Sequence, residues 1–464
     1  MARVELQITR RSFLKSAVAT AGGAAVAGNM FKSALASELE PVGLSPDWFY
    51  GGTIETTYNY CDMCPWRCGI KVQTVNGVVH KIEGNPADPK SRGMLCARGQ
   101  GGVSFLYDPD RLQAPMVRTG ERGEGKFQEV TWEEALDESA EKLMAIAEEY
   151  GPESVAIFGH TSGDFWFTDY FAQAWGTPNA AKPSSSLCTS PREEAASLTM
   201  GFPIGGHEPV DWDEGLRCLT LIGSHIGEDS RNTTMQDFAN AYAKGAKVIV
   251  VDPRFSTVAG KADYWLPIKP GTDTALLLAW INVIINEERY DADYVAEWTE
   301  GFDELKAHVQ EFTPEWAAEI TDLPADLIHE TALVMSDNLP QSLIMPGRHV
   351  TWYGNDSQRM RATYIINALL GAYGREGGFY FNKSPYIESY PHPPFAVAGS
   401  SGGCSAEPGG DADAPLPVGP SGKARADGAR TTFMRGATAM QELIEPMITG
   451  EPYPIKALIV YGVN

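Results

Sequence analysis

Four of the seven cysteines lie close together in the sequence, in the pattern Cys61-x2-Cys64-x3-Cys68-x27-Cys96. Cysteines separated by two or three residues are poorly placed for disulfides with one another, whereas thiolates that converge on one point suit a metal ion or a cluster. A tight triplet followed by a remote fourth cysteine is typical of an iron–sulfur cube. The spacing therefore predicts that these four residues hold a [4Fe–4S] cluster.

The main alternative for the four cysteines is a structural zinc site, because four thiolates also satisfy tetrahedral zinc. Such sites usually contain two matched C-x2-C pairs, rather than three clustered cysteines and one remote cysteine. The pattern favours the cluster and leaves zinc as the alternative.

The segment between Cys68 and Cys96 must return the fourth cysteine to the first three. Residues 69–84 alternate in hydrophobicity, and the turn pair Asn76-Gly77 stands in their middle. This arrangement predicts a β-hairpin, so the long spacing is compatible with one shared site.

A second set of candidates follows predicted strands. Residues 154–159 form a short apolar run that ends at His160, and residues 218–224 form another that ends in Gly223 and Ser224. A helix is expected over 231–244, and a third apolar run, 247–252, ends in Asp252. Ligands bind at strand ends in open α/β sheets, where a glycine lets a phosphate approach and an acid can hydrogen-bond a ribose.

Cys188 precedes Ser190-Pro191-Arg192-Glu193, which predicts a helix with an N-cap serine and a capping box. A helix N-terminus lowers the pKa of a nearby thiol and favours the thiolate that a metal requires. On the residues alone, a metal ligand and a buried structural cysteine are equally good interpretations. Cys218, inside a predicted strand, is expected to be a packing residue.

The cysteine region also resembles a known family, the molybdopterin oxidoreductases of the dimethyl sulfoxide reductase superfamily. The resemblance rests on Cys-Asp-Met-Cys-Pro-Trp-Arg-Cys-Gly at 61–69, Glu-Gly-Asn-Pro at 83–86 and Gly-Met-Leu-Cys-Ala-Arg-Gly at 93–99. It implies a [4Fe–4S] cluster and a bis-molybdopterin guanine dinucleotide cofactor with molybdenum or tungsten.

The resemblance implies an α/β fold: a small β-rich iron–sulfur domain, then two Rossmann-like doubly wound α/β domains built from discontinuous segments, with the C-terminal barrel missing. We expect a signal peptide at 1–36, the [4Fe–4S] domain at 54–108, the first part of an α/β domain at 109–183, a dinucleotide-binding α/β domain at 184–340, and an incomplete return segment of the first α/β domain at 341–464. The chain end suggests a truncation.

The resemblance also assigns roles to single residues. Cys188 becomes the expected protein ligand to molybdenum, and Arg98 the cation between cluster and pterin that relays electrons. Asp252 and Arg254, with Gly271 and Asp273, match family motifs that bind a guanine dinucleotide.

A further strand, 341–346, is expected to lead into an active-site turn, Gly347-Arg348-His349, in which Gly347 and His349 would bind the cofactor. Arg348 would hold an anionic substrate, with a structural salt bridge as the alternative. His160, with an ordinary pKa near 6.5, would donate a proton. The absence of a complete G-x-G-x-x-G after a strand speaks against NAD.

Within the family, these motifs look most similar to polysulfide and thiosulfate reductases. The expected function is that of a respiratory catalytic subunit that reduces polysulfide, thiosulfate or tetrathionate. The alternatives are a formate dehydrogenase, an arsenate or nitrate reductase, or a metal-free electron-conducting subunit of the same fold. Expected partners are a quinone-reactive membrane anchor and a ferredoxin-like iron–sulfur subunit.

The N-terminus and the charge bear on location and partners. Residues 9–15, Thr-Arg-Arg-Ser-Phe-Leu-Lys, precede an Ala/Gly-rich stretch and an Ala-Leu-Ala site at 34–36, which resembles a twin-arginine export signal. We expect a periplasmic protein that is membrane-associated through its partners. A net charge of −23 excludes nucleic acid as a partner.

The apolar run Thr274–Ile285 is too short to span a bilayer and predicts a buried helix. Residues 391–431, which include Cys404, are expected to be an irregular loop.

Overall fold

The structure is a computed structural model. It describes residues 52–64, 66–159, 171–172, 174–181, 190–201, 210–212, 215–224, 226–228, 232–346, 354–380 and 443–461. The expected signal peptide at 1–36 and the expected loop at 391–431 lie outside these residues.

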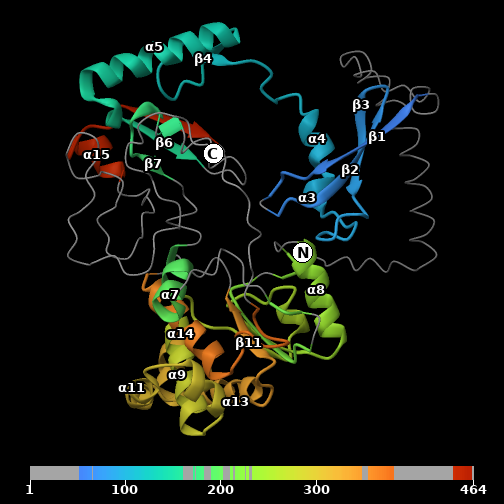
Figure 1. The fold of residues 1–464 in the computed structure, drawn as a ribbon, viewed down its shortest axis with the longest axis vertical. Coiled ribbons are helices and arrows are strands. Elements are labelled where there is room, and N and C mark those ends of the chain that lie inside the picture. Colours follow the sequence, from blue (N-terminus) through green and yellow to red (C-terminus); the bar gives the residue numbers. More distant parts are fainter. Residues whose placement is uncertain are drawn as a thin grey trace, which may run out of the picture.

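The N-terminal unit is a three-stranded antiparallel sheet in the order β1-β2-β3 (Figure 1). Its strands are β1 (Ile54–Tyr60), β2 (Gly69–Val75) and β3 (Val78–Gly84). Asn76 and Gly77 both have positive φ, 51° and 82°, as a two-residue hairpin turn requires. The predicted hairpin is confirmed, and β1 adds a third strand along β2.

Two short helices and a second hairpin follow. The helices are α3 (Ala97–Gln100) and α4 (Gly102–Leu106), and the hairpin joins β4 (Met116–Arg118) to β5 (Phe127–Glu129). A longer helix, α5 (Trp132–Tyr150), begins at a capping box between Thr131 and Glu134.

The largest sheet is parallel, with the order β10-β9-β8-β11. Its strands are β8 (Cys218–Ile222), β9 (Lys247–Val251), β10 (Tyr264–Leu266) and β11 (Ser342–Pro346), and α8 (Asn232–Ala243) connects β8 to β9. Strands β8, β9 and β11 and helix α8 agree with the elements expected from the sequence, whereas β10 was not expected; the alternation is that of a dinucleotide-binding fold.

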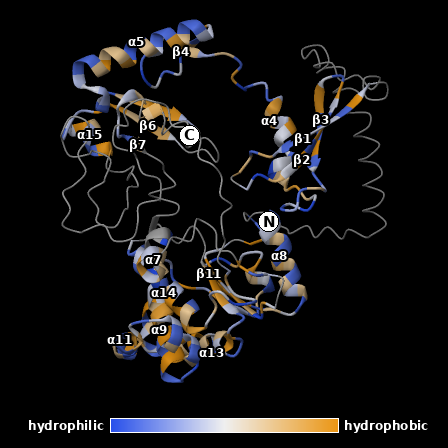
Figure 2. Cartoon of the chain, viewed as in Figure 1, coloured by the Kyte–Doolittle hydropathy of each residue, from blue (hydrophilic) through white to orange (hydrophobic). Residues whose placement is uncertain are grey.

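Both faces of this sheet are covered, because successive residues of each strand point to opposite sides. Leu219, Leu221 and Val248 pack with Phe238 of α8 on one face. On the other face, the residues between them, such as Ile249, pack against α9 (Asp273–Asn286). The strands contribute buried apolar residues to both faces, and the doubly wound fold is confirmed. In Figure 2, β11 is drawn largely in the hydrophobic colour.

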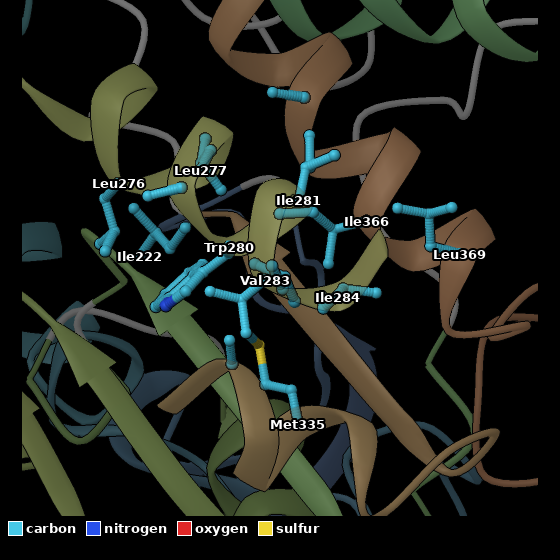
Figure 3. Packing of buried hydrophobic residues seen from close by; sticks show 14 of the residues in the cluster. Ile222, Leu276, Leu277, Trp280, Ile281, Val283, Ile284, Met335, Ile366 and Leu369 are labelled. Atoms are coloured by element: carbon cyan, nitrogen blue, oxygen red, sulfur yellow. The ribbon is translucent and has the colours of Figure 1, made fainter. Parts of the chain in front are cut away.

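Helix α9 is the centre of the main core (Figure 3). The ring of Trp280 is fully buried, and its Nε1 donates to the carbonyl of Ile328 and to Oγ1 of Thr331. Burying one large apolar side chain contributes about 1.5–3 kcal/mol. The helices around α9 are α10 (Ala292–Trp298), α11 (Phe302–His308), α12 (Pro314–Thr321), α13 (Ala325–Ser336) and α14 (Asp356–Leu369).

A smaller parallel sheet has the order β12-β6-β7. Its strands β6 (Val155–Gly159), β7 (Ala180–Ala181) and β12 (Ala457–Tyr461) lie near α15 (Ile444–Thr449) (Figure 1). Residues 341–464 therefore supply β11 to the large sheet and β12 to the small one, so the boundary expected after residue 340 does not follow sheet membership.

The helix α7 (Ser190–Met200) packs against α14 and includes Ser190 as its first residue, so it begins one residue earlier than expected from the predicted N-cap at Ser190. Among the described helices, none combines the length and the apolar composition that a membrane span needs. The run Thr274–Ile285 lies within buried α9, as predicted.

Candidate functional site

The structure describes two groups of the predicted site residues. One group is the four cysteines with Arg98, and the other lies at the carboxyl edge of the large sheet. The remaining predicted residues, all expected near the metal, fall outside the described part of the chain: His160, Cys188, Gly347, Arg348 and His349.

The four cysteines come together at one end of the N-terminal sheet. Cys61 follows β1 and Cys68 precedes β2, and the Cys61 backbone N–H donates to the Cys68 carbonyl over 2.8 Å. The sulfurs of Cys61 and Cys68 are close enough to interact electrostatically with those of Cys64 and Cys96. All four are free thiols.

The surroundings of the sulfurs favour a cluster. Burial raises the pKa of the Cys61 and Cys68 thiols, and the neighbouring cysteine sulfurs raise each of them further. Four thiolates in one place therefore need compensating positive charge, which the irons of a cluster supply. The residues present fit a [4Fe–4S] cluster.

Among the described residues, no set of three His, Cys, Asp or Glu side chains has the geometry to hold a single metal ion. The preference for a cluster over the zinc alternative rests on the spacing of the cysteines, three clustered and one remote.

Cys96 sits directly before α3, is only partly buried, and differs from Cys61 and Cys68. Burial acts to raise its pKa, but hydrogen bonds from the backbone N–H groups of Gly99 and Arg98 and from the Arg98 side chain bring the net pKa below its ordinary value. Arg98 thus places its guanidinium beside a predicted ligand, where a cation stabilises added negative charge. Its role as an electron relay stays a prediction.

Asp88 holds the loop that leads to Cys96. Its carboxylate accepts hydrogen bonds from the backbone N–H of Gly69, at 2.8 Å, and from the backbone N–H of Ser91, at 3.0 Å. Burial opposes its ionisation, but these hydrogen bonds and that from the Ser91 hydroxyl bring its pKa below the ordinary value. Asp88 therefore ties the start of β2, next to Cys68, to the segment before Cys96.

Gly84 lets the same loop approach the sheet. A Cβ at Gly84 would lie 2.2 Å from the carbonyl oxygen of Gly93. Only glycine permits this contact, which fixes the path of the chain between β3 and Cys96.

At the carboxyl edge of the large sheet, Gly223 and Ser224 follow β8, and Asp252 follows β9. Gly223 has a φ of 56°, and Ser224 and Asp252 are buried. One oxygen of Asp252 accepts the backbone N–H of Arg254 at 2.8 Å. A glycine, a hydroxyl and a carboxylate at neighbouring strand ends form a set of hydrogen-bonding groups suited to a dinucleotide.

The side chain of Arg254, at this edge of the large sheet, forms an ion pair with Glu228. Its guanidinium lies 2.6 Å from Glu228, whose other oxygen accepts the backbone N–H of Thr257 at 2.8 Å. The Thr257 backbone hydrogen bond first, and then that from Arg254, lower the pKa of Glu228 to about 2. The side chain of Arg254 is held in place and remains 55% exposed.

Gly271 and Asp273 lie at the beginning of α9. Gly271 has a φ of 83°, and Asp273 is the first residue of the helix. Burial raises the pKa of Asp273, the Arg359 guanidinium at 3.6 Å lowers it in part, and the charge of Asp252 raises it. Asp273 and Asp252 therefore share one electrostatic environment at the sheet edge.

Cys218 is separate from both groups. It is fully buried, and burial raises its pKa to about 12. It is a packing residue, as predicted.

Two residues near the cysteines were not among those predicted from the sequence. Asp88 could have been found, because an acid two residues after Asn-Pro in a loop is a common turn-former. Asn232 could not: its side chain reaches the cysteine loops from α8, 138 positions further along the chain.

Two family models match the chain. The model described as Molybdopterin oxidoreductase Fe4S4 domain matches residues 54–108, and the model described as Molybdopterin oxidoreductase matches residues 111–442.

Individual relatives span the two regions. The chain is 34% identical to the thiosulfate reductase molybdopterin-containing subunit PhsA of Salmonella typhimurium, over 98% of this chain and 57% of that protein. It is 29% identical to the dimethyl sulfoxide reductase DmsA of Escherichia coli, over 68% of this chain and 43% of that protein. The chain thus spans about half the length of these relatives.

Among solved structures, acetylene hydratase from Pelobacter acetylenicus is similar, with a TM-score of 0.68 and 24% identity. The match covers 87% of this chain and 56% of that one. At 24% identity, this similarity supports the fold alone.

Proposed function

Because the chain belongs to the molybdopterin oxidoreductase family, we propose that it is the catalytic subunit of a molybdoenzyme that reduces polysulfide, thiosulfate or tetrathionate. Its cofactors are a [4Fe–4S] cluster and a molybdopterin. The proposed substrate class rests on the similarity to a thiosulfate reductase subunit over nearly the whole chain.

The reaction is a two-electron cleavage of a sulfur–sulfur bond. With thiosulfate, two electrons and one proton yield sulfite and hydrogen sulfide anion. The molybdenum, when bound in two molybdopterin guanine dinucleotides, supplies a centre that exchanges two electrons.

The residues of this chain have distinct parts in that proposal. Cys61, Cys64, Cys68 and Cys96 hold the cluster through which electrons enter, and Arg98 stabilises charge beside it. Gly223, Ser224, Asp252, Arg254, Gly271 and Asp273 bind the dinucleotide.

At the metal, Cys188 is the protein ligand, Arg348 orients the anion and His160 donates the proton. The family motifs support these three assignments.

We further propose export by the twin-arginine route and a respiratory role in the periplasm. The signal-like residues 1–36 support the export. Electrons would come from a quinone-reactive membrane anchor through a ferredoxin-like iron–sulfur subunit. The thiosulfate reductase relative is itself described as one subunit, which supports an assembly of several chains.

A substrate panel tests the proposal. The complex, purified without oxygen around the full-length protein, should oxidise a reduced dye with thiosulfate, polysulfide or tetrathionate as the acceptor. Turnover with nitrate or arsenate alone, or with formate as the donor, would assign the chain to another member of the family.

His160→Ala tests the proton donor. Turnover should fall about 100-fold or more while the molybdenum content is unchanged, because general acid catalysis typically contributes that much. His308→Ala, on the exposed side of α11, is the matched control. Unchanged turnover in His160→Ala would exclude this role.

A further inference from the structure

An exposed aromatic ring stands beside the strand edge that is expected to bind the dinucleotide. Phe255 lies three residues after Asp252, the acid that follows β9, and is 64% exposed. In open α/β sheets the acid after such a strand hydrogen-bonds a ribose, so the base of the nucleotide lies near the residues that come next. We propose that Phe255 is a further cofactor-binding residue, whose ring stacks on the base of the dinucleotide; this rests on the cofactor of the proposed function.

Glu228 holds the turn that carries Phe255. One of its carboxylate oxygens lies 2.6 Å from the guanidinium of Arg254. The other accepts hydrogen bonds from the backbone N–H of Thr257, at 2.8 Å, and from the Thr257 hydroxyl, at 3.0 Å. Glu228 lies between β8 and α8, so a residue of the neighbouring connection fixes the chain on both sides of Phe255. The turn is therefore tied to the carboxyl edge of the large sheet.

Trp265 of β10 fixes the ring itself. The centroids of the Phe255 and Trp265 rings are 4.9 Å apart and their planes meet at 71°, which is an edge-to-face contact. Trp265 is anchored in turn, because its Nε1 donates to the carbonyl of Asp252 over 2.8 Å. An edge-to-face contact covers at most one face of the Phe255 ring. At least one face therefore stays open to a flat ligand.

The arrangement has the composition of a nucleotide site. Cofactor sites combine a few polar groups with aromatic walls. Ser224 and Asp252 are polar groups at this edge, and Phe255 supplies an aromatic wall beside them. A base stacks on such a ring through its flat π-face, and no covalent bond forms or breaks. Phe255 thus contributes to holding the cofactor and takes no part in the chemistry at the metal.

The test measures how firmly the full-length holoenzyme, purified without oxygen, retains its cofactor. The enzyme is incubated and separated from released cofactor at intervals, and GMP is then freed from the retained protein by acid hydrolysis and counted per chain. Phe255→Ala should speed the loss of GMP about fivefold or more, because stacking of one base on an aromatic side chain contributes at least that factor to binding. Phe255→Trp keeps a stacking ring and should retain GMP as the wild type does. Phe255→Leu keeps the apolar bulk without a ring and should fall between them.

Phe105→Ala is the matched control, because Phe105 is 62% exposed but belongs to α4 of the iron–sulfur domain. It should lose GMP at the wild-type rate. A wild-type rate in Phe255→Ala would overturn the proposal. So would equally fast loss from Phe255→Ala and Phe255→Trp, because the ring would then act only through packing, and so would a wild-type enzyme that contains no GMP. Failure to turn over sulfur substrates, with the retention of GMP changed as expected, would bear on the proposed function alone.

Discussion

The carboxylate of Asp88 accepts a hydrogen bond of 2.8 Å from the backbone N–H of Gly69, the residue that follows Cys68. The same oxygen accepts from Ser91, on the way to Cys96. One carboxylate therefore sets the distance between two segments that carry predicted ligands.

Replacing Asp88 with Asn should weaken this link. The amide keeps the shape but loses the charge and one acceptor, so the free energy of unfolding of the iron–sulfur domain should fall by about 1–2 kcal/mol after allowance for solvent screening. Thermal unfolding followed by cluster absorbance measures the change. Asp110→Asn, at an exposed position that follows the same domain, should have no such effect, and equal stabilities of the two variants would contradict the role of Asp88.

Gly84→Ala should displace the loop before Cys96. The new methyl group would meet the Gly93 carbonyl, and overpacking of this kind costs about 1–3 kcal/mol. We expect reduced iron content in the purified protein. Gly101→Ala is the control, because its Cβ would meet its nearest atom at an ordinary 3.4 Å. Full iron content in Gly84→Ala would show that the loop path is not critical.

Cys64→Ser should remove a cluster ligand. The loss of affinity should exceed the roughly 10–100-fold that an outer-shell partner contributes, and iron should be lost on purification. Cys218→Ser, at a buried cysteine away from the site, should keep its iron although it perturbs packing. Retention of a complete cluster in Cys64→Ser would contradict the assignment of Cys64.

The pair of Glu228 and Arg254 should give a pH-dependent contribution to stability. The pKa of Glu228 is about 2 in the folded protein, against an ordinary value of 4.5. A carboxylate whose pKa is lowered by folding stabilises the fold above its ordinary pKa, and that contribution is lost as the pH falls toward the folded value.

Glu228→Gln should therefore lower the melting temperature at pH 6, and the difference from wild type should shrink as the pH is lowered from 5 to 3. Calorimetry across this range measures it. Glu330→Gln, at an exposed acid of α13, serves for comparison. A difference that stays constant with pH would contradict the ion pair.

Local patterns were sufficient to predict much of the fold. Asn76-Gly77 between alternating segments predicted the hairpin, and the apolar runs that begin at Cys218 and Lys247 predicted buried parallel strands. These features depend on neighbours in sequence, where turn chemistry and periodicity act directly.

The features that were not predicted depend on contacts between segments far apart in the chain. Neither the pairing of β12 with β6 nor the reach of Asn232 to Met94 has a local signature, because each joins residues far apart in the chain. The four cysteines were predicted from spacing, whereas the groups that hold them, Asp88 and Asn232, became visible only in three dimensions.

The most direct test of the account is metal analysis of the full-length protein purified without oxygen. We predict about four iron atoms and one atom of molybdenum or tungsten per chain, with the iron in a cube held by Cys61, Cys64, Cys68 and Cys96. Zinc in place of iron, or iron without molybdenum or tungsten, would contradict it.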